Sequence, residues 1–261
     1  MKIIITGING RMGGEVAHAI LAGPTYEIIG ATLRNPSLIG KDVGEVLGVK
    51  PLGVAATPLS ETDFTAADGV IDFTLPAGLP ELATKCAQAG VALVTGTTGL
   101  SDEQQAVVNQ AATEIPIVQS FNMSLGVNLL AALVEKAAAT LDESFDIEIN
   151  ELHHRHKKDA PSGTAKLLGE SAAKARGVTL SEAGVMDRDG ERNVGDIGFS
   201  VQRGGGVIGD HTVMLAGENE RLELIHRGHN RAIYADGALK ATKWLQGKPA
   251  GLYSMRDVLG L

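Results

Sequence analysis

The sequence has few of the residues that cross-link a chain, stack on bases or cross a membrane. Its one cysteine, Cys86, allows no intrachain disulfide and fits a reducing compartment. The surrounding "ELATKCAQAG" predicts a helix, and we expect the thiol to be buried in the hydrophobic core. Aromatic residues make up only 3% of the chain, too few for a platform that stacks nucleic-acid bases. No apolar run approaches the roughly 20 residues of a membrane span. The short run in "MKIIITG" does not make a secretion signal, so we expect a cytoplasmic protein.

An excess of positive charge is also missing. The chain carries 23 basic and 31 acidic residues, a formal charge of −8, which argues against a general affinity for nucleic acid. With 261 residues and 44% hydrophobic content, it is long and apolar enough for one large domain or two modest ones.

The first half alternates between predicted strands and helices. The β-branched run "KIIIT" predicts a strand buried on both faces, and the segment from Arg11 onwards has apolar residues at helical spacing. "YEIIGATL", "GVIDFT", "GVALVTG" and "IPIVQS" predict further strands. Ser101 and Gln104 form a capping-box pattern at the start of a helix. Strands that alternate with helices at this spacing predict a parallel sheet joined by right-handed crossovers.

The pattern changes after this region. "MSLGVNLLAALVEKAAATL" predicts a long helix and "FDIEINELHH" an alternating strand; three later strands look like an antiparallel meander, and the tail returns to helix with stop signals at Gly247 and Pro249. We therefore predict an α/β Rossmann-type dinucleotide-binding domain over 1–122. An α+β domain with a mostly antiparallel open sheet follows over 123–231, and 232–261 returns to the first domain.

Glycines follow the first predicted strand in the order G-x-x-G-x-x-G, at Gly7, Gly10 and Gly13. In this strand–turn–helix context they predict a tight turn whose amides approach a pyrophosphate, although a purely structural turn would look similar. The second strand ends in "GATLRNPS", without the acid that would bind a ribose hydroxyl. Arg34 would instead favour a 2′-phosphate, unless it is simply a solvated surface residue. The "TGTTG" loop, Thr95–Gly99, is expected on the cofactor side if it is not an ordinary turn.

The stretch "HHRHKKDAPSGTA" crowds cations just before a predicted helix start. A solvated strand end, or histidines satisfied at a domain interface, would explain it without function. A zinc site is a further alternative, but successive rings on a strand point to opposite faces and no cysteine ligand is near. In the functional interpretation, Ser162 caps the helix, the amides of Gly163 and Thr164 bind an anion, and Lys157 and the histidines add positive charge. Such a site suits a small dicarboxylate and can supply the acid in a reduction.

With these motifs together, the sequence resembles the 4-hydroxy-tetrahydrodipicolinate reductase (dihydrodipicolinate reductase) family over nearly its whole length. The shared motifs are "GxxGRMG", "DFTLP", "GTTG", "NMSLGVN", "ELHHRHKKDAPSGTA" and "GLYSMRDVLGL". The histidine-rich motif is highly specific, whereas the glycine loop is not. The resemblance implies reduction of a cyclic, conjugated dicarboxylate by a nicotinamide hydride in lysine and diaminopimelate biosynthesis, by a homotetramer built through the open sheet of the second domain.

The resemblance also implies residue roles. His153 would be the acid/base and Lys157 the proton donor, and His154, Gly163 and Thr164 would contact the substrate. The expected cofactor-binding residues are Gly7, Ile8, Asn9, Gly10, Arg11, Met12, Arg34, Gly96, Thr97, Thr98, Ser120, Phe121, Asn122, Met123 and Arg231. Two departures are Arg34 with Asn35 in place of an acid, which favours NADPH over NADH, and Met123 in place of the more usual Phe. No metal is expected.

Two other functions are compatible with parts of the sequence. A non-catalytic redox sensor would bind the dinucleotide but would not need Lys157 or the anion-binding helix start. Another NAD(P)-dependent dehydrogenase would oxidise an amino or hydroxy compound, for which the dense cation cluster is less suited than for a dicarboxylate.

Overall fold

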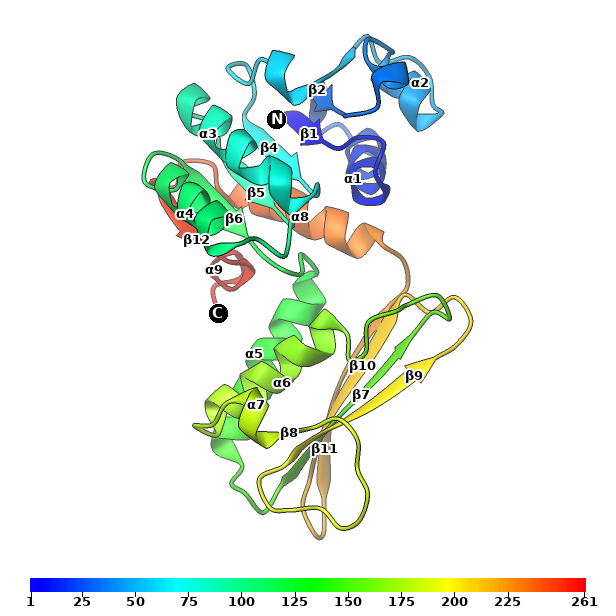
Figure 1. Cartoon of the computed structure of the whole chain (residues 1–261), viewed down its shortest axis with the longest axis vertical. Helices are drawn as coiled ribbons and strands as arrows, with labels where there is room; N and C mark the ends of the chain where they lie inside the picture. Colours follow the sequence, from blue (N-terminus) through cyan, green and yellow to red (C-terminus); the bar gives the residue numbers. More distant parts are fainter. The chain divides into compact units, whose positions relative to one another are not determined.

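The computed structural model describes residues 1–261, which form two compact units. The first unit comprises Met1–Ser124 and Ala232–Gly260. The second comprises Leu125–Arg231, with the terminal Leu261 (Figure 1). The chain therefore leaves the first unit once and returns to it. The first boundary expected from the sequence, after residue 122, lies two residues before Ser124.

A seven-stranded parallel sheet lies at the centre of the first unit, in the order β12-β6-β5-β4-β1-β2-β3. The strand β1 is buried at every residue after Lys2, and β4 along its whole length, as expected for strands covered on both faces. The Rossmann-type fold predicted for this part is thereby confirmed. The strands are β1 (Lys2–Thr6), β2 (Glu27–Thr32), β3 (Ala56–Thr57), β4 (Gly69–Asp72), β5 (Leu93–Thr95), β6 (Pro116–Gln119) and β12 (Gly251–Tyr253).

Helices pack in two groups on this sheet. α1 contacts α8, and α3 contacts α4. The chain crosses from β1 to β2 in one direction along the sheet and from β4 to β5 in the other, so right-handed crossovers place α1 and α3 on opposite faces. Cys86 of α3 is fully buried in the core between α3, α4 and the sheet, as predicted, and burial raises the pKa of its thiol. The helices are α1 (Arg11–Leu21), α2 (Val43–Leu47), α3 (Leu79–Ala89), α4 (Asp102–Ala111), α8 (Ala232–Trp244) and α9 (Met255–Leu259), with short 3-10 turns η1 (Pro36–Leu38), η2 (Leu59–Glu61) and η3 (Pro76–Gly78).

The second unit packs helices on one face of a five-stranded sheet with the order β11-β10-β7-β9-β8. Burial alternates strictly along β7, where Ile147 and Ile149 face the core beneath α5 and α6 while the intervening residues stay half-exposed. The elements are α5 (Leu125–Thr140), β7 (Asp146–His153), α6 (Gly163–Ala175), α7 (Leu180–Ala183), β8 (Gly184–Val185), β9 (Ile197–Arg203), β10 (Gly209–Ala216) and β11 (Arg221–Gly228).

This second sheet is mixed, so the predicted antiparallel meander is wrong in one respect. β10 pairs antiparallel with β11 and with β7, but β9 pairs parallel with β7 and does not touch β10. The connection 204–208 crosses the end of β7, where Gly204 N donates to the His153 carbonyl and Arg155 N donates to the Gly205 carbonyl. A short glycine-rich connection resembles a hairpin turn in sequence, although here it spans an intervening strand.

The C-terminal tail holds one element that the helical prediction missed. After α8 the chain forms β12, which adds a parallel edge strand beside β6, before ending in α9. The predicted capping box at α4 is confirmed, since Ser101 and Gln104 exchange side-chain and backbone hydrogen bonds.

Candidate active site

The glycine turn between β1 and α1 has the geometry that the nucleotide-binding interpretation requires. Gly7 has a φ of +67°, and a Cβ there would lie 2.9 Å from Thr74 Cγ2. Gly10 N donates to the Gly7 carbonyl at 2.8 Å, and a Cβ on Gly13 would overlap that same carbonyl. Larger side chains would therefore open the turn, and the glycines let backbone amides at the start of α1 face a ligand.

A cavity of about 350 Å³ opens beside this turn, at the carboxyl ends of β1, β2 and β4. This is the point where the strand order reverses, at which open α/β sheets bind their ligands. Arg34 is the only charged residue in its wall, and a Cβ on Gly78 would lie 2.8 Å from Arg34 Nη2. The cavity is lined by Thr6, Gly7, Asn9, Gly10, Thr32, Leu33, Arg34, Asn35, Leu59, Phe73, Thr74, Leu75, Gly78 and Leu82.

A buried carboxylate that sequence reasoning missed lies beneath the same cavity. Asp72, at the end of β4, is completely buried, and its Oδ1 accepts hydrogen bonds from the hydroxyls of Thr6 and Thr74, both at 2.6 Å. Its Oδ2 accepts from the hydroxyls of Thr95 at 2.8 Å and Thr97 at 2.7 Å. One side chain therefore ties together the ends of β1, β4 and β5. A threonine near each of three strand ends is the signal that could have pointed to it.

The remaining cofactor-binding candidates are spread over several environments. Gly96 stacks so closely on Phe73 that a Cβ there would overlap the ring, and Thr97 is buried against Asp72. The segment 120–123 follows β6; Phe121 is 82% exposed, whereas Met123 is buried. Ile8 is fully buried. The wall of the 350 Å³ cavity includes neither Ile8 nor the candidates Arg11, Met12, Thr98, Ser120 and Asn122. Arg231 is the last residue of the second unit's main segment and is half-buried.

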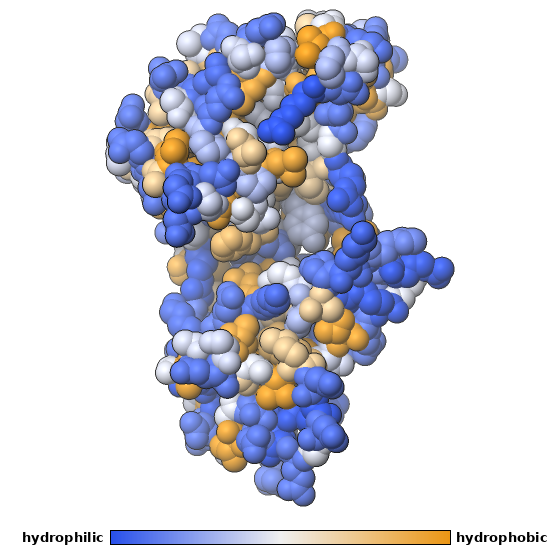
Figure 2. Space-filling view, viewed as in Figure 1, coloured by the Kyte–Doolittle hydropathy of each residue, from blue (hydrophilic) through white to orange (hydrophobic).

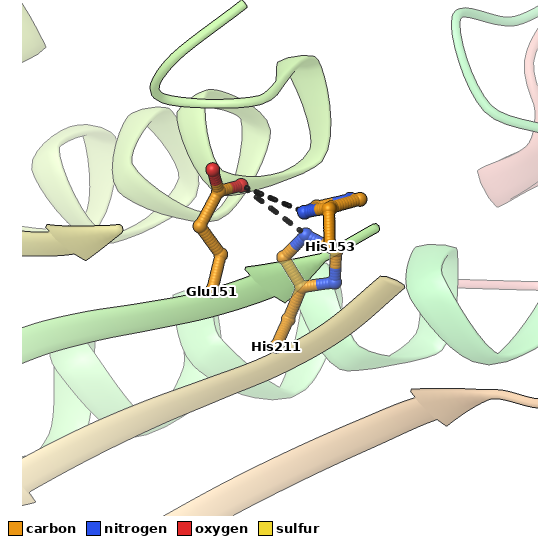
Figure 3. Close-up of side chains that lie close together, drawn as sticks. All are labelled: Glu151, His153 and His211. Carbon is orange, nitrogen blue, oxygen red and sulfur yellow. Dashed lines mark ion pairs between the residues drawn. The ribbon is translucent and has the colours of Figure 1, made fainter. Parts of the chain in front are cut away.

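In the second unit, the end of β7 gathers three ionisable side chains into one buried cluster (Figure 3). His153 and Glu151 lie on the same face of β7, and His211 of β10 is directly opposite Glu151 in the antiparallel register. His153 Nδ1 lies 3.5 Å and His211 Nε2 3.8 Å from Glu151 Oε2. Of these, only His153 was predicted, because pairing between distant strands cannot be seen in a local motif.

The same carboxylate reaches two further elements. Arg203 of β9 donates to Glu151 Oε1 at 3.0 Å, and the backbone N–H of Ser162 donates to Oε2 at 3.1 Å. Ser162 is the N-cap of α6, as predicted, and its Oγ accepts from Ala165 N at 3.1 Å. The helix start that carries Gly163 and Thr164 is thus anchored to β7, and the space around Gly163 is open.

Burial governs the charge state of both histidines. It lowers the pKa of His153, with Lys157 and Arg203 acting in the same direction and Glu151 opposing them. Burial and the neighbouring His153 lower the pKa of His211 to about 4. Both rings are therefore expected to be neutral near pH 7, so each can share a single N–H proton with a partner.

The rest of the cationic stretch, beyond His153, is arranged differently. Lys157 Nζ donates to both carboxylate oxygens of Asp159 at 2.9 Å, and this contact lowers the pKa of Asp159. The rings of His154 and His156 lie 6.2 Å apart, while His153 turns to the buried side. The three histidines considered for zinc therefore do not converge on one point.

Glu151, His153 and His211 present ligand atoms within 4.8 Å of one another, a spacing that a metal ion could bridge. However, the Arg203 guanidinium already supplies positive charge to Glu151, and the Ser162 N–H occupies its second oxygen. A cation would have to compete with both, so we interpret the cluster as one that controls the position of a proton.

Comparison with known proteins identifies the family of the two units that carry the glycine turn and the Glu151 cluster. Residues 1–123 match the family described as "Dihydrodipicolinate reductase, N-terminus", and residues 126–259 match "Dihydrodipicolinate reductase, C-terminus". The chain belongs to the dihydrodipicolinate reductase family. The resemblance found from the motifs is thereby confirmed over both units.

Relatives in this family cover the whole chain. A 4-hydroxy-tetrahydrodipicolinate reductase of Mesorhizobium japonicum is 51% identical over 100% of this chain and 97% of its own length. The Brucella abortus protein of the same name is also 51% identical, over 100% and 99%. A dipicolinate-bound dihydrodipicolinate reductase from Paenisporosarcina has the same fold, with a TM-score of 0.79 at 24% identity and 97% coverage of each chain.

The surface does not suggest a membrane-spanning element. No helix has both the length and the apolar composition needed to cross a bilayer, and hydrophobic residues are scattered among hydrophilic ones on the face shown in Figure 2.

Proposed function

We propose that the protein catalyses the NAD(P)H-dependent reduction of 4-hydroxy-tetrahydrodipicolinate to tetrahydrodipicolinate, a step of lysine and diaminopimelate biosynthesis. The observation that carries this proposal is the full-length family match, which includes the complete stretch from Glu151 to Thr164. Hydride addition and proton uptake reduce the ring, and the hydroxyl group departs as water.

The first unit supplies the dinucleotide site in this proposal. The glycine turn and the amides at the start of α1 fit a pyrophosphate, because a Cβ at Gly7 or Gly13 would fill the space that the turn needs. When bound, the reduced nicotinamide supplies the hydride. Arg34 is the one charged residue in a cavity wall without an acid, which favours a 2′-phosphate and therefore NADPH.

The second unit supplies the dicarboxylate site. Amides in the first turn of α6, at Gly163 and Thr164, bind one substrate carboxylate, and the half-buried His154 contributes a further contact. The protonated ammonium of Lys157 stabilises negative charge that develops on the ring and then donates the proton, while His153 acts as acid/base.

Steady-state reduction of enzymatically generated substrate, followed by the loss of reduced nicotinamide absorbance, tests the activity directly. NADPH and NADH are compared for the wild type and for Arg34→Ala. We expect a preference for NADPH that this substitution weakens, with little change for NADH. No turnover with either cofactor would refute the reductase function, and equal use of both would refute the role of Arg34.

A thermal-shift measurement separates the enzyme from a redox sensor. The reductase should be stabilised further when pyridine-2,6-dicarboxylate is added to the NADPH complex. A sensor would respond to NADPH alone.

We also propose that the enzyme is a cytoplasmic homotetramer. The face of the second unit's sheet opposite α5 and α6 carries half-exposed residues and a hollow of about 540 Å³ between Glu148, Asn150, Thr212, Met214 and Arg227. A sheet face without covering helices is a suitable surface for association with another copy. Light scattering on the purified protein would detect a tetramer, and a monomer or dimer would refute this part.

A further inference from the structure

Glu151 is a buried carboxylate without a role of its own in the proposed reaction, yet it lies at the centre of the His153 cluster (Figure 3). Its side chain is 1% exposed, and a carboxylate so deeply buried is costly unless its oxygens are well paired. The partners are Arg203 on one oxygen, and the Ser162 N–H with the two histidines around the other. Every group around it is therefore a hydrogen-bond donor or can become one.

These partners come from elements that carry different parts of the substrate site. His153 ends β7, whereas Ser162 caps the helix whose first residues are Gly163 and Thr164. Because Oε2 of Glu151 faces both His153 and the Ser162 N–H, this carboxylate fixes the distance between the imidazole and the start of α6.

The orientation of the His153 ring follows from the same contact. Nδ1 lies 3.5 Å from Glu151 Oε2, an ion-pair distance without hydrogen-bond geometry, and Nε2, on the other side of the ring, lies beside Gly209. A Cβ at position 209 would be 3.0 Å from Nε2, so a larger residue there would crowd this nitrogen. When Nδ1 carries the proton and faces a carboxylate, Nε2 becomes the nitrogen that exchanges protons with a ligand.

His211 supports Glu151 from the neighbouring strand. Its Nε2 lies 3.2 Å from Ser162 Oγ and 3.8 Å from Glu151 Oε2, and its ring packs edge-on against His153 with the centroids 5.1 Å apart. Only 3% of this residue is exposed. An Nε2–H proton would thus be directed at Ser162 and Glu151, while Nδ1 has no hydrogen-bond partner.

We propose that Glu151 and His211 are positioning residues for His153: Glu151 accepts the Nδ1 proton and directs Nε2 to the substrate, and His211, with Ser162, holds the Glu151 carboxylate in place. This inference rests on the proposed reductase function. The charged groups that face His153 are Glu151 and Asp159, which favour its protonated form, and Lys157 and Arg203, which disfavour it. Without the charge of Glu151, only Asp159 would oppose burial and the two cations.

The variant Glu151→Gln tests the role of that charge while keeping the side-chain shape. We expect kcat/KM to fall by about 10- to 100-fold, the range seen when the partner that orients a metal-binding imidazole is removed. The limb of the pH–rate profile that reports His153 should move to lower pH, and the affinity for NADPH should keep its wild-type value. Glu135→Gln is the matched control: Glu135 is also a carboxylate of this unit paired with a cation, Lys174, but it is not a member of the cluster. An unmoved limb in Glu151→Gln would overturn the proposal, because a merely structural loss does not shift it.

Two substitutions at His211 separate hydrogen bonding from packing. In His211→Gln the side-chain amide can still donate to Ser162 Oγ, and we expect most of the activity to remain. His211→Leu fills similar space without a donor and should lose kcat/KM as Glu151→Gln does. Wild-type kcat/KM in the Leu variant would remove His211 from the proposal. If His211→Leu fails to fold, His211→Gln alone decides. The proposal requires it to retain most of the activity, so a kcat/KM as low as that of Glu151→Gln would contradict it.

Imidazole NMR on the ¹⁵N-labelled protein reads the tautomer of His153 without any turnover. We expect the Nδ1–H form in the wild type and a shift toward Nε2–H in Glu151→Gln, with the signal assigned by its loss in His153→Asn. An Nε2–H tautomer in the wild type would overturn the positioning role even if the enzyme reduces the dicarboxylate. Conversely, an inactive wild type with the Nδ1–H tautomer would refute the reductase function and leave the positioning of His153 supported.

Discussion

Removing the Asp72 carboxylate should destabilise the first unit more than any comparable change of an exposed acid. Four threonine hydroxyls donate to this buried side chain, at 2.6 to 2.8 Å. A hydrogen bond to a charged group contributes about 1.5–3 kcal/mol, but bonds to one acceptor are not additive. For Asp72→Ala we therefore expect a loss of roughly 3–6 kcal/mol in the free energy of unfolding, because the hydroxyls would be left buried without their acceptor. Asp72→Asn keeps one acceptor oxygen and should lose less.

The assay can observe this unit alone. Trp244 is the only tryptophan of the chain and lies in α8, so its fluorescence during urea unfolding reports the first unit. Asp63→Ala is a matched control, since Asp63 also accepts from a threonine, Thr65, through its backbone N–H at 2.9 Å and its hydroxyl at 2.8 Å, but in an exposed turn. This control should lose no more than about 1 kcal/mol. If Asp72→Ala and Asp63→Ala unfold at the same urea concentration, the threonine cluster does not hold the strand ends together as we reason.

Three further predictions concern the turn, the proton donor and the pH response. Gly13→Ala should abolish NADPH binding measured by calorimetry, because its Cβ would overlap the Gly7 carbonyl and open the turn. Lys157→Ala should lower kcat by about 10²- to 10⁴-fold while NADPH affinity is retained, and equal turnover would remove Lys157 from the mechanism. The pKa of His211 is lowered from its ordinary value of 6.5 to about 4, so between these two pH values the unfolded chain binds a proton that the folded chain does not. The free energy of unfolding should therefore decrease as the pH falls from about 6.5 to about 4, by up to about 3 kcal/mol. Urea unfolding at several pH values, followed by circular dichroism because Trp244 reports only the first unit, should show a smaller fall for His211→Gln.

Local patterns were sufficient to predict most elements of the first unit. The buried run of β1, the helix after it and the capping box at Ser101 depend on residues close together in the sequence, and each is found where it was expected. The turn at Gly7 was predictable for the same reason. β12 was missed because an edge strand of three residues has too little periodicity to distinguish it from the helical segments around it.

Contacts between distant strands were not predictable in the same way. Glu151 is in the motif that drew attention to His153, but its importance depends on the register that brings His211 of β10 opposite to it. Arg203 reaches Glu151 only because β9 lies on the other side of β7, which the sequence did not reveal. Likewise, Asp72 gains its four hydroxyl partners only when three separate strands lie side by side.

Two cations at the candidate site, Arg203 of β9 and Lys157 of the histidine-rich stretch, have different surroundings. Arg203 is bound to a carboxylate that is 1% exposed, so its charge is committed to holding Glu151 and the start of α6. Lys157, whose side chain is 20% exposed, is in contrast paired with Asp159, whose side chain is 62% exposed, and a pair open to solvent on one side contributes on the order of 1 kcal/mol. A substrate carboxylate can therefore replace Asp159 at the ammonium at little cost, whereas it cannot displace Glu151 from Arg203. On this reasoning the buried pair keeps the site's shape, and the half-buried Lys157 is the cation available to a dicarboxylate.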